Sequence, residues 1–131
     1  GPLRVTRALL VSAAQQEDDN GRLLAVGTDN ADIVAGVIGW LDPEAPDIAV
    51  RIAHHAGNSL WRGIRLPLTI HPDRRYVRRA GVRRGLAALA QAGVLAEFLA
   101  APDQLGNVAA VLADLPNLTA IIDHAGCSIR P

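Results

Sequence analysis

The chain has 131 residues, half of them apolar, so it is long enough for one domain with a buried core and is neither disordered nor fibrous. Thirteen arginines balance thirteen acidic residues and there is no lysine, so no strong net charge draws the protein to nucleic acid or anionic lipid. No apolar run approaches the roughly 18–20 residues of a membrane span, and no signal peptide opens the sequence.

Apolar runs alternate with stretches of helical spacing along the chain. In chain order we predict strands over residues 7–13, 34–41, 63–68, 94–100 and 118–123, and helices between them over residues 17–28, 46–56, 77–92 and 102–115. Most of the strands are apolar at successive positions, which is typical of parallel strands covered on both faces. No low-complexity linker divides them, so we interpret residues 1–131 as a single α/β domain, in which residues 1–2 resemble the remnant of a cleaved purification tag.

This alternation, with about 25–30 residues per unit, implies a parallel sheet with right-handed crossovers. Two architectures satisfy it: an open, doubly wound sheet, or part of a closed barrel of eight strands and eight helices. A complete barrel of that kind takes about 250 residues. Length alone therefore favours the open sheet of five strands.

Four segments of the chain point instead to the barrel. They are, in chain order, VAGVIGWLDPEAPD, WRGIRLPL, GLAALAQAGVLAEFLAAPDQL and LPNLTAIIDHAG. In this order and spacing the chain resembles the amidohydrolase-related family of barrel hydrolases, and above all its lactonase branch of fuconolactonase-like and pyrone-dicarboxylate-lactonase-like enzymes. The resemblance implies that the strands are the second to sixth of a TIM (β/α)8 barrel, which a single chain of this length leaves incomplete. The family's His-x-His pair would precede Gly1, and its catalytic aspartate would follow Pro131.

The last predicted strand ends on two ionisable residues, Asp123 and His124. Functional side chains of parallel barrels gather where strands end, and neighbours on a strand face opposite ways, so only one of the two can point inward. The resemblance implies that His124 is catalytic: it would polarise the substrate carbonyl, or bind a metal in the metal-dependent branches. The alternative is a histidine satisfied by backbone contacts at a strand end.

Two further residues are candidates for substrate binding. Arg65, near the end of its strand, can grip a substrate carboxylate with two hydrogen bonds, unless it forms a structural ion pair at the rim. His71 follows the same strand on the pocket side, although Pro72 marks a turn in which an exposed loop histidine is the alternative. Glu97 lies within a strand and needs a partner if it is buried.

The sequence predicts no certain cofactor. Metal-dependent relatives often carry a histidine before the proline that ends the fifth strand, whereas here Ala101 precedes Pro102. The alternatives are a reaction without a metal and a divalent metal held without this ligand. His54 and His55 are neighbours in the last turn of a helix, which makes a shared metal difficult. The arginines of RRYVRRAGVRR spread around a helix, so a solvated outer surface is favoured over a phosphate site.

These observations favour a hydrolase that opens a lactone or a similar cyclic carbonyl compound, incomplete or inactive unless further strands or a partner subunit complete it. We expect a small-molecule substrate, no nucleic-acid or membrane partner, and a homo-oligomer, because unpaired strand edges tend to pair. The single cysteine, Cys127, favours a reducing, cytoplasmic location. The alternative function is a non-catalytic, flavodoxin-like binding or interaction module.

Overall fold

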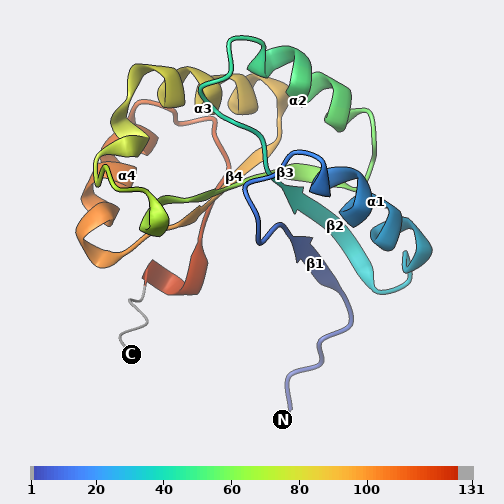
Figure 1. The fold of residues 1–131 in the computed structure, drawn as a ribbon. Coiled ribbons are helices and arrows are strands. Elements are labelled where there is room, and N and C mark those ends of the chain that lie inside the picture. The colour runs from blue at the N-terminus through green and yellow to red at the C-terminus, as the bar shows by residue number, and fades with distance from the viewer. Residues whose placement is uncertain (1, 127–131) are drawn as a thin grey trace.

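The computed structural model describes residues 2–126, which form one parallel sheet with helices between its strands (Figure 1). The strands are β1 (Ala8–Val11), β2 (Val34–Gly39), β3 (Trp61–Pro67), β4 (Leu95–Leu99) and β5 (Ala120–Ile122). The helices are α1 (Asp19–Asp29), α2 (Ile48–Ala56), α3 (Ala80–Ala92) and α4 (Leu105–Ala113), with short 3-10 turns η1 (Leu68–Ile70), η2 (Tyr76–Arg78), η3 (Pro102–Gln104) and η4 (Asp123–Gly126). The predicted succession of strands and helices is confirmed.

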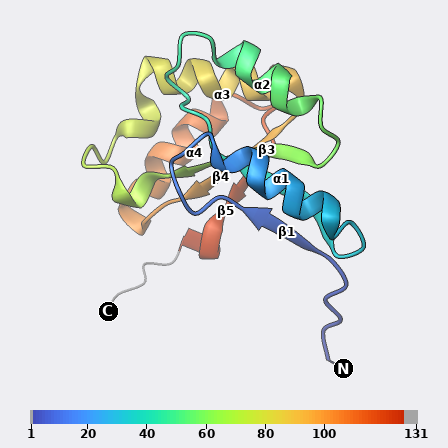
Figure 2. The ribbon, with the colours of Figure 1, turned by 45° about the vertical axis from the view of Figure 1, so that its right-hand side comes forward.

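The spatial order of the strands, β1-β2-β3-β4-β5, is the same as their order in the chain, and every neighbouring pair is parallel. Because each crossover moves one strand further in the same direction and with the same hand, the helices all lie on one side of the sheet (Figure 2). A doubly wound sheet reverses direction and has helices on both faces. The chain therefore forms the half-barrel, and not the open doubly wound sheet that its length favours.

The core lies between the sheet and the helix layer. Side chains at alternate strand positions enter it, as Ile64 and Leu66 of β3 and Phe98 of β4 show, all at most 2% exposed. They meet apolar side chains of the helices such as Leu86 and Leu89. The intervening strand positions, among them those of Arg65 and Glu97, therefore face away from the helices. Within residues 2–126, no helix combines the length and the apolar character needed to cross a membrane.

The helix predicted over residues 77–92 is interrupted at its start. Arg79 has an extended conformation (φ −59°, ψ 141°), which ends the turn η2 and makes α3 begin at Ala80. At the other end, Gly93 has φ 70° and donates its N–H to the carbonyls of Ala90 and Leu89, the left-handed cap that favours glycine. Gly57, which follows α2, instead has an ordinary φ of −64°.

Candidate functional site

Three charged side chains meet on the helix-free face of the sheet. Arg65 of β3 and Glu97 of β4 are register partners, and Asp123 directly follows β5. Arg65 donates a hydrogen bond from Nη2 to Oδ2 of Asp123, and its Nε lies 3.4 Å from Oε1 of Glu97. The side chains of Arg65, Glu97 and Asp123 are only 19%, 5% and 18% exposed. The partner that Glu97 requires is therefore Arg65, shared with Asp123.

The pKa values of the two carboxyl groups in this cluster are shifted in opposite directions. Burial, and then the neighbouring Asp123, raise the pKa of Glu97 to about 7, against the lowering effect of Arg65. Burial also acts to raise the pKa of Asp123, but the hydrogen bonds with Arg65 and Glu97 outweigh it and hold that pKa below its usual value. Glu97 therefore retains a proton to a higher pH than an exposed glutamate does, while Asp123 carries the negative charge that balances Arg65.

A pocket of about 100 Å³ opens beside Arg65 at the carboxyl ends of the strands. Arg65 Nη1 makes a long contact of 3.5 Å with the carbonyl oxygen of Ser12, which also lines the pocket. Sites for small molecules usually occupy about 300–1,000 Å³, so this pocket encloses only part of a ligand. Its lining residues are Ser12, Ala13, Ala14, Trp40, Arg65, Pro67, Ile70 and Leu99.

His124 lies at the tip of β5 with an exposed side chain. His124, Ala125 and Gly126 have φ values of 49°, 52° and 72°, so the chain passes through three consecutive left-handed residues. For a residue other than glycine this conformation costs about 1–2 kcal/mol. Of the two ionisable residues at this strand end, Asp123 is the one that contacts Arg65, and the catalytic role of His124 stays a prediction.

His71 lies apart from the charged cluster. Its Nδ1 accepts a hydrogen bond from the backbone N–H of Asp73 (3.1 Å), and its ring stacks on Tyr76 with centroids 4.0 Å apart. The preceding residue, Ile70, lines the pocket, but His71 does not. The structure therefore does not bring His71 together with Arg65, and substrate binding by His71 remains a prediction.

A polar contact at the pocket residue Trp40 was not predicted from the sequence. Asn20 of α1 is fully buried; it accepts the N–H of Trp40 at Oδ1 and donates to the carbonyl of Trp40 at 2.7 Å. Its Nδ2 also lies 3.3 Å from Nε2 of His55, whose ring packs on Trp61. His55 thus belongs to a structural network that holds the pocket residue Trp40 in place. An asparagine in a polar stretch of the sequence does not indicate such a contact, because its burial depends on the packing of α1 against distant residues.

The described residues do not assemble a metal centre of their own. Within residues 2–126, no three histidine, cysteine, aspartate or glutamate side chains converge to hold an ion. A zinc site commonly needs three or four such ligands. Cys127 lies outside the described residues. Any metal bound near His124 would need ligands from beyond this part of the chain.

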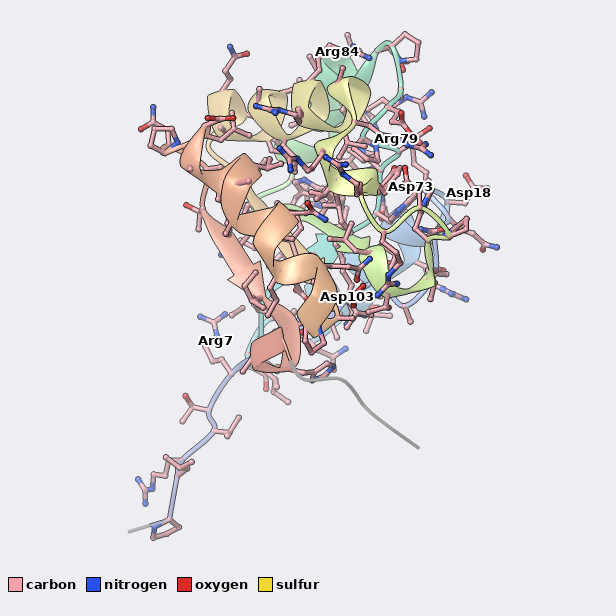
Figure 3. The ribbon with its side chains drawn as sticks, turned by 90° about the vertical axis from the view of Figure 1, so that its left-hand side faces the viewer. Arg7, Asp18, Asp73, Arg79, Arg84 and Asp103 are labelled. Atoms are coloured by element: carbon pink, nitrogen blue, oxygen red, sulfur yellow. The ribbon has the colours of Figure 1, made fainter. Side chains whose placement is uncertain are left out.

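Three arginines of the arginine-rich segment, Arg74, Arg79 and Arg83, pair with acidic residues on the outer surface. Arg74 forms two hydrogen bonds with Asp103, at 2.7 and 2.9 Å, and Arg79 pairs with Asp73 at 3.0 Å (Figure 3). Arg84 lies on the outer side of α3, away from the sheet (Figure 3). Arg74 and Arg79 precede α3, so only part of the segment lies on the predicted helix, and at this exposed surface each ion pair contributes about 0–1 kcal/mol.

Comparison with known proteins identifies the family. The family model described as amidohydrolase matches residues 4–129, nearly the whole chain. The chain belongs to the amidohydrolase family. A curated relative, the L-fucono-1,5-lactonase of Burkholderia multivorans, is 36% identical over 95% of this chain and 43% of its own length. A second L-fucono-1,5-lactonase, from Burkholderia ambifaria, is 28% identical over 92% of this chain and 41% of its own.

Solved structures agree with this family assignment. An amidohydrolase from Burkholderia multivorans, crystallised with bound zinc, superposes with a TM-score of 0.84 at 33% identity, over 93% of this chain and 43% of that one. A probable 2-pyrone-4,6-dicarboxylic acid hydrolase from Acinetobacter baumannii, at 17% identity and a TM-score of 0.68, shares the fold over 92% of this chain and 43% of its own. The chain spans less than half the length of these relatives, and the predicted amidohydrolase resemblance and incomplete barrel are confirmed.

The raised pKa of Glu97 predicts that this amidohydrolase segment loses stability as the pH rises. A carboxyl group with a pKa of about 7 in the folded state binds its proton more tightly than it does in the unfolded chain. The free energy of unfolding should therefore fall between about pH 4.5 and 7, by roughly 2–3 kcal/mol from this group. Urea unfolding at several pH values measures it. In Glu97→Gln this contribution should vanish, and equal slopes for the two proteins would contradict the assignment.

Proposed function

We propose that this chain is the central part of a hydrolase that opens a lactone or a similar cyclic ester. The observation that carries the proposal is the 36% identity with an L-fucono-1,5-lactonase over nearly the whole chain. The charged cluster and the pocket support it, because both lie where the strands end, which is where barrel enzymes place their reactive groups.

In this proposal the side chains at the strand tips act on the ester group. His124 polarises the ring carbonyl by hydrogen bonding, and the left-handed backbone at residues 124–126 supports a functional role, because strained residues concentrate at such sites. Arg65 donates hydrogen bonds to the substrate, and His71 contacts it from the loop after β3. The group that activates the attacking water comes from outside residues 2–126, and a bound divalent metal would supply the same activation.

The test is hydrolysis of L-fucono-1,5-lactone, the substrate in the relative's name. The coding sequence extended on both sides to the length of the relatives should hydrolyse this lactone, and His124→Asn in that longer protein should lower kcat by about 10²–10³-fold. Asp103→Asn, which alters an exposed ion pair at 59% exposure, is the matched control and should leave kcat unchanged. A longer protein that folds, binds ligands and hydrolyses no lactone would favour the binding module.

We also propose that the isolated chain forms a homo-oligomer in the cytoplasm. The helix-free face and the outer edges of β1 and β5 support self-association, because unpaired strand edges and apolar surface tend to pair. Leu9 of β1 is 41% exposed. The solution mass should then exceed 13.8 kDa at micromolar concentration, and a monomer at every concentration would contradict the proposal.

A further inference from the structure

The proposed reaction assigns no role to Glu97, although its carboxyl group is buried. Its side chain is 5% exposed and does not line the pocket beside Arg65. The charged groups around it come from the neighbouring strands: Arg65 from β3, and Asp123, followed by His124, from the end of β5. Burying a carboxyl group costs several kcal/mol, and an ion pair offsets this only in part. The burial of Glu97 beside Arg65 therefore requires an explanation.

The contacts of Arg65 indicate what Glu97 does. One edge of the guanidinium is bound by Asp123 through Nη2, and the buried Nε faces Glu97 at 3.4 Å without a hydrogen-bond partner among residues 2–126. Nη1 has the long 3.5 Å contact with Ser12, a residue of the pocket wall. A guanidinium has five N–H donors in one plane. With Nη2 bonded to Asp123 and Nε turned toward Glu97, Nη1 is the nitrogen that faces the pocket and can serve a ligand.

We propose that Glu97 is a positioning residue that, together with Asp123, fixes the guanidinium plane of Arg65 so that its Nη1 donors bind an oxygen atom of an uncharged lactone. This inference rests on the proposed function, whose substrate class it narrows. The two acids hold the guanidinium from neighbouring strands, β4 and the end of β5. A single acid would leave the plane free to rotate about the one hydrogen bond.

The charge balance of the cluster explains the preference for an uncharged ligand. The cluster sets two carboxyl groups against one guanidinium, so in either protonation state of Glu97 the pocket presents N–H donors without net positive charge. Such donors are sufficient for a hydroxyl or carbonyl oxygen. A carboxylate loses strong hydration when it enters the pocket, and only a cation that is not already paired would offset this loss. Arg65 is therefore a hydrogen-bond donor in this site, a narrower role than the carboxylate clamp expected from the sequence.

The first arm of the test needs no ligand. In the 131-residue chain, the Nε–H signal of Arg65 is followed by NMR in the wild type, Glu97→Gln and Glu97→Ala. We expect the exchange of this proton with water to rise about tenfold or more in Glu97→Ala, and to stay within about threefold of the wild type in Glu97→Gln, which keeps an oxygen at the same place. Unchanged exchange in Glu97→Ala would overturn the positioning role, even if that variant were less stable.

The second arm measures binding of L-fucono-1,5-lactam, which resists hydrolysis, with 2-pyrone-4,6-dicarboxylate as the charged comparison. At pH 6.5, affinity for the lactam should fall about tenfold in Glu97→Ala and stay within about threefold in Glu97→Gln. Glu44→Gln, whose carboxylate pairs with Arg79 on the surface, is the matched control.

The outcomes separate the two proposals. An ordered Arg65 that depends on Glu97, in a chain that binds no lactam, would support the positioning role and count against the lactone substrate. Lactam binding that is equal in the wild type and Glu97→Ala would overturn the positioning role while leaving the proposed function standing. Tighter binding of the dicarboxylate than of the lactam would overturn the preference for an uncharged ligand.

Discussion

Gly63→Ala is expected to prevent this chain from forming its native sheet. Gly63 of β3 has φ 155° and lies opposite Leu95 of β4, and a Cβ atom added to it would stand 1.9 Å from the carbonyl oxygen of Leu95. Neither backbone can withdraw without breaking the β3–β4 pairing, which also joins Arg65 to Glu97. We expect a loss of more than about 4 kcal/mol, a large part of the stability of a small domain.

Circular dichroism and urea unfolding measure this loss, and Gly21→Ala is its matched control. Gly21 lies in α1 with nothing within 4 Å of the added Cβ, so the same change there should be neutral or stabilise by up to about 1 kcal/mol. A Gly63→Ala protein with native stability would show that the β3–β4 contact is looser than the structure indicates.

Arg65→Leu should be nearly as damaging, for an electrostatic reason. Without the guanidinium, Glu97 and Asp123 face one another on the sheet with side chains only 5% and 18% exposed and no cation between them. Removing one member of a buried ionic group typically costs about 3–5 kcal/mol, because the remaining charge is left uncompensated. The free energy of unfolding at pH 8 should fall by about this amount.

The pH dependence distinguishes this cause from a packing defect. Arg65 lowers the pKa of both acids, so in Arg65→Leu both pKa values rise. Groups with a raised pKa in the folded state contribute stability at low pH and lose it as the pH rises, so the deficit should shrink from pH 8 to pH 5. Urea unfolding across this range measures it. Arg74→Leu, which breaks an exposed pair with Asp103, should cost less than about 1 kcal/mol at both pH values. A deficit independent of pH would contradict the electrostatic account.

The order and type of the elements follow from the sequence because they depend on local composition. Apolar runs at successive positions predicted β2 and β4, and the helix predicted to end at residue 92 does end there, where Gly93 adopts the left-handed conformation. The end of β3 was placed within one residue, at Leu68 instead of Pro67. The predicted start of α3 was three residues too early. The helical spacing of the sequence continues through Arg79, so it does not reveal that this residue is extended.

The candidate site depends on contacts between distant residues, and only the tertiary structure decided them. Arg65 could be singled out from its place at a strand end, but its partners lie 32 and 58 positions further along the chain (97 − 65 and 123 − 65). Strand register brings those carboxyl groups to one guanidinium. By itself the sequence determined the five strands, their helices and the strand ends that carry ionisable groups, because hydrophobic periodicity and turn chemistry are local. Side-chain direction and burial made Asp123, and not His124, the partner of Arg65, and they raised the pKa of Glu97. Both arise only when separate strands are packed side by side.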